Sequence, residues 1–282
     1  MAGPDPVLPE VGVTAVGVAA ARAVETARPD RLFADRFAAS FVRAAGSDRL
    51  SPERAESRQR HASLFAWVAV RTRFLDDLVL DACARGCRQV VILGAGLDAR
   101  AFRLSWPDNL RLFEIDLPQV LEFKEQVVRA EAWRPCCERI TVPADLSEDW
   151  SRPLLDAEFD AHAPVAWLAE GLLAYLSPRA CDSLIIRVGE LSVPGSRLGL
   201  TLASARRLQA WREAHPDDTG EPGDYVALWR SATAEMAVEW LDSHGWRAKV
   251  FDVAERSAAY GRPLLEDARR ADGARLVDAE RR

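Results

Sequence analysis

The sequence predicts an α/β fold in which a mostly parallel sheet carries helices on both faces and follows a helical N-terminal region. Two observations predict it. From residue 89 onward, short runs of β-branched and apolar residues alternate with longer stretches of helical periodicity, which is the pattern of βαβ units. Before residue 80, apolar residues recur at three- and four-residue spacing, which is typical of helices. A chain of 282 residues can bury a full core without disulfides or structural metals.

The N-terminal region is predicted to be helical over residues 12–80. The spacing is clearest in the segments Leu32–Ala45 and Ala62–Leu80. A Gly-Ser-Asp run at 46–48 breaks the pattern, and Pro52 suits the first turn of a new helix.

The rest of the chain supplies the strands and helices of the sheet. The strand candidates are Gln89–Leu93, Arg111–Ile115, Arg139–Val142, Val165–Ala169, Arg197–Leu202 and Arg247–Phe251. The helix candidates are Leu117–Trp133, Pro178–Leu191 and Ala232–His244. Prolines, glycines and aspartates in residues 205–230 predict a loop-rich insertion over the sheet edge. The run ARLVDA at Ala274–Ala279 predicts a final edge strand.

Composition and charge exclude several classes of function. The net charge of −6, from 43 acidic and 37 basic residues, disfavours nucleic acid as the main partner because phosphates would repel the protein. The apolar run Val11–Ala21 is too short to span a bilayer, and no basic segment leads into it as in a signal peptide. Five cysteines without framework spacing predict buried thiols, and we expect no metal site. We therefore expect a cytoplasmic protein without a membrane partner.

A glycine turn after the first strand candidate is the strongest local motif. Gln89–Leu93 is followed by GAGLDA, whose glycines let the chain turn tightly and let a ligand approach the backbone. About twenty residues later the second strand ends at Asp116, where an acid can accept hydrogen bonds from ribose hydroxyls. GAGLDA also satisfies the dinucleotide fingerprint, so the turn does not choose between adenosine cofactors. A purely structural tight turn is the other interpretation.

Acids also follow the third and fourth strand candidates. Asp145 and Leu146 follow the third strand, where an acid can accept from an adenine amino group and a leucine can cover the ring. Glu170 ends the fourth strand, at the edge where open α/β sheets bind ligands. Taken singly, Asp145 could be a helix N-cap and Glu170 a solvated strand end. Acids at three neighbouring strand ends favour a shared ligand site.

At these residues the chain resembles the leucine carboxyl methyltransferase family. It is especially similar to the bacterial branch of small-molecule O-methyltransferases, which includes polyketide carboxyl methyltransferases of the tetracenomycin type. The likeness runs from about residue 14 to the end and depends on several blocks in order. These are TA at 14–15, ARAVE at 21–25, VRTRFLDD at 70–77, GAGLDAR at 94–100, FEIDLP at 113–118, ADL at 144–146, LAEGLLAYL at 168–176, HGW at 244–246 and YGRP at 260–263.

The resemblance implies a Rossmann-like class I methyltransferase with a seven-stranded, mostly parallel sheet. Residues 1–80 would form an N-terminal helical lid, and residues 81–282 the core that binds S-adenosyl-L-methionine, within one compact domain. The insertion at 205–230 would lie over the acceptor pocket. The cofactor would leave as S-adenosyl-L-homocysteine.

The resemblance also implies the cofactor contacts. Gly94 and Gly96 would lie against the cofactor, Asp116 would bind the ribose, and Leu117 is a further cofactor contact. Asp145 and Leu146 would contact the adenine, and Glu170 the region of the amino group.

Arg71 and Arg22 would hold the cofactor's carboxylate, since a guanidinium can meet a carboxylate with two parallel bonds. Arg73 could take the place of Arg71. The two side chains point about 200° apart on a helix, so only one should face the site.

The acceptor is predicted to be a carboxylate of a small molecule, and a hydroxyl is the alternative. A carboxylate is ionised at neutral pH and needs no general base, whereas a phenol would profit from one. The histidines that could serve are His61, His162, His215 and His244, and none falls in the strand-end motifs.

Aromatic residues supply the candidate acceptor contacts. Tyr175 follows Glu170 by five residues, and we predict that it faces the transferred methyl group. Tyr225 and Trp229 lie four apart, so they can share one helix face and line the acceptor pocket. Core packing is the alternative for all three. The other functions considered are an NAD(P)-dependent oxidoreductase and an inactive S-adenosylmethionine-binding protein of the same fold. A homo-oligomer is compatible with the sequence.

Overall fold

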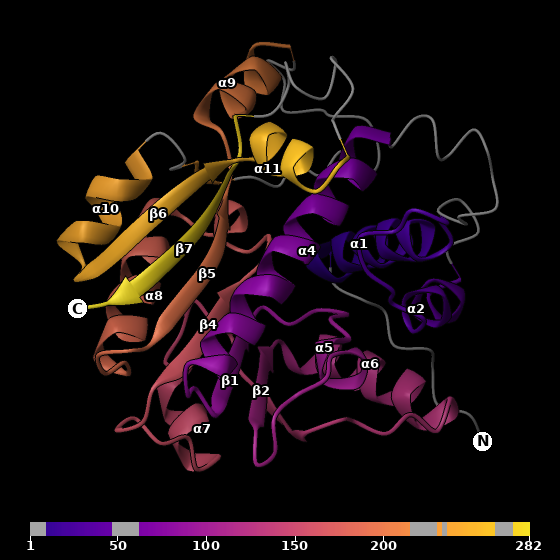
Figure 1. Ribbon diagram of the computed structural model, residues 1–282, viewed down its shortest axis with the longest axis horizontal. Helices are drawn as coiled ribbons and strands as arrows, with labels where there is room; N and C mark the ends of the chain where they lie inside the picture. Colours follow the sequence, from indigo (N-terminus) through magenta and orange to yellow (C-terminus); the bar gives the residue numbers. More distant parts are fainter. Residues whose placement is uncertain (1–9, 47–61, 215–229, 233–235, 263–272) are drawn as a thin grey trace.

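Seven strands form one sheet at the centre of the computed structural model (Figure 1), which describes residues 10–46, 62–214, 230–232, 236–262 and 273–282. The strand order across the sheet is β3-β2-β1-β4-β5-β7-β6. β7 is antiparallel to both its neighbours, and the other pairs are parallel. The strands are β1 Gln89–Leu93, β2 Arg111–Asp116, β3 Glu138–Pro143, β4 Val165–Ala169, β5 Arg197–Leu202, β6 Trp246–Asp252 and β7 Arg275–Arg281.

Helices cover both faces of the sheet (Figure 1). On one face, residues of α1, α2, α4 and α6 pack against alternate strand residues such as Val90 and Ile92. On the other, α7, α8 and α10 pack against the intervening residues, such as Val91 and Leu93. Burial on both faces explains why the residues of β1 after Gln89 are all apolar. The helices are α1 Glu10–Thr26, α2 Ala38–Ala44, α4 Ala62–Ala84, α5 Arg100–Arg103, α6 Pro118–Ala130, α7 Ser151–Asp156, η2 Leu173–Tyr175, α8 Pro178–Glu190, α9 Ala205–Ala214, α10 Ala237–Ser243 and α11 Val253–Ala259. Among the described residues, no helix is long and apolar enough to cross a bilayer.

The strand register brings three carboxyl ends together. Leu93 at the end of β1 pairs with Ile115, so the glycine turn begins beside Asp116. Ile92 pairs with Leu168 of β4, two residues before Glu170. Because parallel strands end at the same edge of a sheet, the residues that follow β1, β2 and β4 surround one place.

The predicted α/β fold and its mostly parallel sheet are confirmed, with three strands at their predicted bounds and the others close to them. One strand is placed differently from the prediction. The segment predicted as a final edge strand is β7, which lies between β5 and β6. Its Asp278 pairs with Arg197 of β5, so a charged residue is accommodated inside the sheet. β3 and β6 are the edge strands.

Two helical predictions also need correction. The insertion predicted to be loop-rich begins with a helix, α9, and residues 215–229 lie outside the described residues. The helix predicted over Leu32–Ala45 is shortened to α2, because the Asp35 carboxylate accepts hydrogen bonds from the backbone of Phe37 and Ala38 (3.1 Å each) and fixes a turn before it.

A cluster of charged side chains is buried between α6 and the sheet. The ammonium of Lys124 lies 2.7 Å from Oε2 of Glu114 on β2, and both side chains are fully buried. Arg139 of β3 contacts the same oxygen at 2.7 Å and also pairs with Glu125. Burial lowers the pKa of Lys124, and the neighbouring Glu114 carboxylate opposes that shift. The cluster ties α6 to two strands whose ends form the site.

Gly199 of β5 lies directly beneath α4. A Cβ there would come within 2.8 Å of Leu75, 3.0 Å of Leu78 and 3.1 Å of Leu168, all buried. We expect Gly199→Val to lower the free energy of unfolding by about 1–3 kcal/mol, because overfilling a packed core forces side chains and backbone apart. Urea denaturation measures this.

The control is Gly17→Ala on α1, where an added Cβ meets nothing within 4 Å. That variant should be neutral or stabilised by about 0.5–1 kcal/mol, as expected for alanine in a helix. Unchanged stability of Gly199→Val would contradict this close packing of α4 on β5.

Candidate functional site

The glycine turn brings the end of β1 against the end of β2. Gly94 and Gly96 have φ values of +64° and +48°, a left-handed region that glycine adopts without strain. The amide of Gly96 donates a 2.6 Å hydrogen bond to Oδ2 of Asp116, and the amide of Leu117 donates a 2.7 Å bond to Oδ1. The carboxylate of Asp116 is thus held by one backbone donor on each oxygen.

Helix α1 lies over this turn. A Cβ on Gly96 would lie 3.3 Å from the Cβ of Ala15 on α1. A Cβ on Gly94 would lie 3.0 Å from Leu172, which follows β4. Both glycines therefore allow close approach of neighbouring segments as well as a tight turn.

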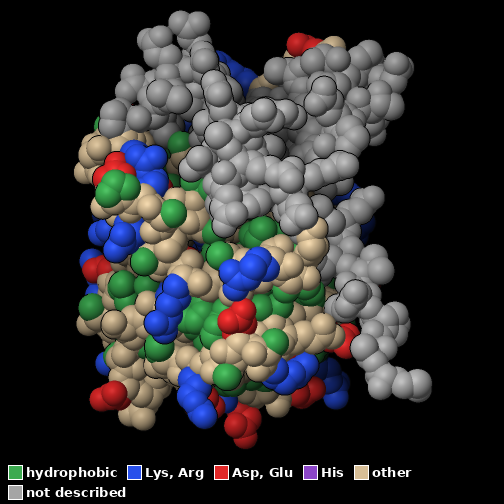
Figure 2. Space-filling model, turned by 90° about the vertical axis from the view of Figure 1, so that its right-hand side faces the viewer, with side chains coloured by type: hydrophobic (Ala, Val, Ile, Leu, Met, Phe, Trp, Pro, Cys, Tyr) green, Lys and Arg blue, Asp and Glu red, His purple; other side chains and the backbone are tan. Residues whose placement is uncertain are grey.

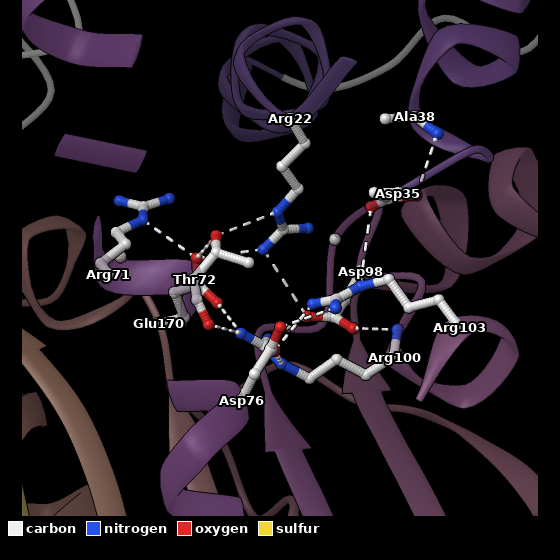
Figure 3. A network of polar contacts seen from close by, with 12 residues as sticks. Arg22, Asp35, Ala38, Arg71, Thr72, Asp76, Asp98, Arg100, Arg103 and Glu170 are labelled. Atoms are coloured by element: carbon white, nitrogen blue, oxygen red, sulfur yellow. Dashed lines mark hydrogen bonds and ion pairs between the residues drawn. The ribbon is translucent and has the colours of Figure 1, made fainter. Parts of the chain in front are cut away.

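Glu170 is the meeting point of three arginines (Figure 3). Its Oε1 lies 3.0 Å from Arg22 of α1 and 3.0 Å from Arg71 of α4. Its Oε2 lies 2.8 Å from Nη2 of Arg100 on α5. The Thr72 hydroxyl adds a 3.3 Å hydrogen bond to Oε1. One carboxylate thus joins the end of β4 to three helices.

The network extends from Glu170 through further ion pairs (Figure 3). The fully buried Arg100 pairs with Asp98 and lies 2.7 Å from Asp76 of α4. Arg103 contacts Asp76 at 2.6 Å, and its Nε lies 3.9 Å from Asp35. We call these eight side chains the lid network: Arg22, Asp35, Arg71, Asp76, Asp98, Arg100, Arg103 and Glu170.

Within the lid network, the ion pairs favour the charged forms of Glu170 and Arg100 despite their burial. Burial opposes ionisation of Glu170, but Arg22, Arg100 and Arg71 outweigh it and hold the pKa of Glu170 well below its ordinary value. Burial likewise opposes the charge of Arg100, but Asp98, Glu170 and Asp76 raise its pKa well above its ordinary value. For Arg71, burial lowers the pKa, and Glu170 offsets only part of that shift. Of the two arginines, Arg71 is therefore the one whose positive charge is not fully offset by neighbouring carboxylates.

The structure places Arg71, and not Arg73, beside Glu170. The side chain of Arg71 is 9% exposed, and its Nε makes the contact. Its terminal nitrogens point away from the lid network (Figure 3). Arg73 points outward, where it pairs with Asp77 one helical turn along α4. This agrees with the expectation that only one of the two arginines faces the site.

Gly171 borders the terminal nitrogens of Arg71, and Tyr175 follows it by four residues. Gly171 has φ +64°, and a Cβ there would lie 3.0 Å from Nη1 of Arg71. Tyr175 ends the short helix η2, is half-buried, and lies near enough to Arg71 to influence its pKa. The turn after β4 therefore carries both Gly171, which lies against Arg71, and the predicted acceptor contact Tyr175.

Asp145 and Leu146 follow the edge strand β3. The side chain of Asp145 is exposed, and its Oδ1 accepts hydrogen bonds from the amide and hydroxyl of Ser147 (2.8 and 2.7 Å). Asp145 is no helix N-cap, because α7 begins at Ser151 and its N-cap is Trp150. Leu146 is half-buried.

Four sequence candidates lie outside the described residues: Tyr225, Trp229, His61 and His215. His162 is exposed in the turn before β4, away from the carboxyl ends of the strands. His244 lies after α10, where its Nδ1 is 2.7 Å from the carbonyl oxygen of Trp240. The described histidines therefore lie away from the strand-end site.

Sequence reasoning missed Asp76, Asp98 and Arg100, although all three belong to blocks that carry the family resemblance. Asp76 had a usable signal. It falls on the buried face of α4 with Thr72 and Val79, at helical spacing. A charge on such a face needs a buried partner. Asp98 and Arg100 carry no comparable signal, because Asp98 lies in an irregular turn and Arg100 begins the four-residue helix α5.

Metal and disulfide chemistry find no support in the described part of the chain. No group of three or more histidine, cysteine or acidic side chains there is arranged to hold a metal. The cysteines are free thiols, and burial raises the pKa of Cys83 to about 12, which makes it a poor nucleophile.

The strand-end residues fit the cofactor that the resemblance implies. Each oxygen of Asp116 accepts one backbone hydrogen bond, and a carboxylate offers about four acceptor sites, so ribose hydroxyls can still bind. The outward nitrogens of Arg71 can meet a carboxylate. On the face that carries the N-terminal helices, acidic and basic side chains are interspersed (Figure 2). That no nucleic acid binds remains an expectation.

Comparison with known proteins gives consistent matches. A model of the family described as leucine carboxyl methyltransferase matches residues 15–189. A protein of Frankia alni, provisionally named an S-adenosyl-L-methionine-dependent methyltransferase, is 47% identical over 276 residues that cover 96% of this chain and 95% of the relative. A similarly named protein of Streptomyces coelicolor is 46% identical over 277 residues, 96% of each chain.

Solved structures share the fold. A DUF574 family protein from Streptomyces avermitilis has a TM-score of 0.61 at 14% identity, covering 94% of this chain and 97% of that one. A protein from Thermobifida fusca, provisionally named a methyltransferase, has a TM-score of 0.57 at 15% identity over 94% of each chain.

Proposed function

The chain belongs to the leucine carboxyl methyltransferase family, and from this premise we propose that it methylates a carboxylate oxygen of a small molecule. Membership makes it a class I methyltransferase that uses S-adenosyl-L-methionine, so the oxidoreductase alternative is set aside. The proposal therefore concerns the acceptor and the residues. We propose an acceptor from secondary metabolism, such as a polyketide acid, on the strength of the resemblance.

The observation that carries the proposal is a strand-end site that contains Arg71 and no described histidine. Arg71 is a buried, incompletely compensated cation whose terminal nitrogens face outward from the lid network. The described histidines lie elsewhere, so the described site offers no imidazole to activate a hydroxyl. An acceptor that is already an anion needs no such base.

Each residue has a proposed task. Asp116 binds the ribose, Asp145 and Leu146 the adenine, and Arg71 with Arg22 the cofactor's carboxylate. When bound, the cofactor supplies a methyl group on a positively charged sulfur, which passes to the acceptor oxygen as the bond to sulfur breaks. The protein orients the acceptor in line and excludes water. Tyr175 positions the acceptor beside that methyl group.

The acceptor class can be tested by the stability of the product. The enzyme is incubated with methyl-labelled S-adenosylmethionine and a panel of aromatic polyketide acids, each matched with its phenolic analogue. A carboxylate acceptor gives a methyl ester, and mild alkali then releases the label as volatile methanol. Label that survives alkali on a phenol would show hydroxyl methylation. Cofactor binding without transfer to any acceptor would favour the inactive alternative.

Replacing Asp116 with alanine should weaken cofactor binding by more than about tenfold, because a carboxylate that meets two hydroxyls makes charge-assisted hydrogen bonds. Calorimetric titration with S-adenosylmethionine measures this.

Burial raises the pKa of Asp116, while the amides of Gly96 and Leu117 partly offset that shift. Cofactor affinity should therefore decrease as the pH falls through this raised pKa, since the protonated acid accepts fewer hydrogen bonds.

The control variant is Asp156→Ala, which removes an exposed carboxylate at the end of α7. It should bind the cofactor like the unmodified protein. Normal affinity in a folded Asp116→Ala variant would refute the ribose assignment.

A further inference from the structure

Two residues of the family blocks, Glu25 and Arg262, have no part in the proposed chemistry and meet in the structure. Glu25 ends the block ARAVE on α1, and Arg262 belongs to the block YGRP after α11. Nη1 of Arg262 lies 3.0 Å from Oε2 of Glu25, and Nη2 lies 3.2 Å from Oε1. The side chains are 17% and 5% exposed. This two-pronged, largely buried ion pair joins segments 237 residues apart.

The backbone at Arg262 is fixed to α11. Its amide donates a 2.9 Å hydrogen bond to the carbonyl of Ser257, and the fully buried Ser257 hydroxyl donates to the carbonyl of Arg262. Two residues earlier, the Tyr260 hydroxyl donates a 3.1 Å bond to Asp77 of α4, and Arg73 of α4 lies 5.6 Å from the Tyr260 ring centroid. The turn after α11 therefore contacts α4 through Tyr260 and α1 through Arg262.

Helices α1 and α4 are the ones that deliver Arg22 and Arg71 to Glu170. On α1, Glu25 lies three residues after Arg22, which is a rise of about 4.5 Å along the helix, on the same side. Glu25 also accepts a 2.6 Å hydrogen bond from the amide of Leu32, which fixes the chain as it leaves α1. The ion pair with Arg262 therefore acts one turn away from Arg22.

We propose that Arg262 is a positioning residue for the cofactor site. It holds the C-terminal end of α1 through Glu25 and so places the Arg22 guanidinium against Glu170. Tyr260 anchors the same turn to α4, so the two helices keep a fixed relation. An arginine suits this task because its planar fork engages both oxygens of Glu25, whereas a lysine would engage them as a single point charge. The inference rests on the proposed role of Arg22 in cofactor binding.

The test is a double-mutant cycle on cofactor affinity, measured by calorimetry with S-adenosylmethionine. Arg262→Gln is expected to weaken cofactor binding about fivefold, which is within the range of coupling free energies between interacting residues. Arg262→Lys is expected to weaken binding by a smaller factor. In an Arg22→Gln background, Arg262→Gln should add less than about twofold, because the group through which it acts is already gone. The control is Arg187→Gln, which breaks an exposed ion pair on α8 and should leave affinity unchanged.

The outcomes separate this inference from the site assignment. If Arg22→Gln weakens binding but Arg262→Gln only lowers the melting temperature, Arg262 is merely structural and the inference is wrong. An equal loss from Arg262→Gln in both backgrounds also overturns it, because Arg262 would then act independently of Arg22. If Arg22→Gln binds normally, the proposed role of Arg22 itself fails. Should Arg262→Gln not fold, Arg262→Lys carries the same cycle.

Discussion

Glu170→Gln is expected to remove measurable cofactor binding and to lower the free energy of unfolding by about 3–5 kcal/mol, the scale for breaking a buried ion pair by removing one partner. Glutamine keeps the shape of the side chain but removes its charge. Arg22, Arg71 and Arg100 would then face one another in the interior without their common carboxylate. Their repulsion should push α1 away from the end of β4, which would disperse the groups that bind the cofactor.

Urea denaturation with and without S-adenosylmethionine measures both effects. The matched control is Glu190→Gln, which removes a carboxylate that pairs with Arg187 on the surface of α8. That change should alter stability by less than about 1 kcal/mol, as is usual for exposed ion pairs. If Glu170→Gln destabilises the protein no more than this control, Glu170 does not organise the lid network.

The same substitution should change the acid limb of the stability profile. The pKa of Glu170 lies well below its ordinary value in the folded protein, because the arginines outweigh burial. The stability that the Glu170 carboxylate contributes is therefore complete above about pH 4.3, the pKa of this group in the unfolded chain. It is lost as the pH falls from there through the lower pKa of Glu170 in the folded protein. Glu170→Gln should lose less stability over this acidic range than the unmodified protein.

Lys124→Met is expected to lower the free energy of unfolding by about 3 kcal/mol, the lower end of the range for breaking a buried ion pair. Methionine can fill much of the same space, so the loss reflects charge rather than volume. Glu114 would remain fully buried, with Arg139 as its remaining cationic partner. The ladder between β2 and β3 ends at Asp116, so a weaker cofactor affinity should accompany the loss.

Lys249→Met gives this experiment its control. Lys249 lies on the edge strand β6 and is exposed, so the same chemical change occurs without a buried partner. Thermal and urea unfolding should place this variant within about 0.5 kcal/mol of the unmodified protein. Equal stability of the two variants would mean that the Glu114 cluster adds nothing to the fold.

The positions of Gly94, Asp116 and Glu170 could be predicted because each depends on local pattern. A buried strand, a glycine turn and the parallel order of strands together place these residues at one edge. The position of β7 in the sheet was harder to predict, because Asp278 and its charged neighbours are typical of a solvent-exposed edge strand. The sequence does not reveal that Arg197 of β5 pairs with Asp278 inside the sheet.

The lid network could be predicted only in part. Helical spacing required that only one of Arg71 and Arg73 face the site, but packing of α4 against β4 and β5 decides which one. The pairing of Arg100 with Asp98, Asp76 and Glu170 joins three segments far apart in the sequence, and no periodicity encodes such a choice. Tyr225 and Trp229 stay predictions, since they lie outside the described residues.

The contrast between the chain's two lysines has a practical consequence. Lys124 is fully buried beneath α6, whereas Lys249 is exposed on β6. An amine-reactive fluorophore should therefore attach to the folded protein at one side chain, besides the α-amino group. Thiol labelling would be less selective, because Cys136 is exposed and the adjacent Cys137 is partly exposed. A reporter at Lys249 would sit on the edge strand β6, away from the carboxyl ends of β1, β2 and β4.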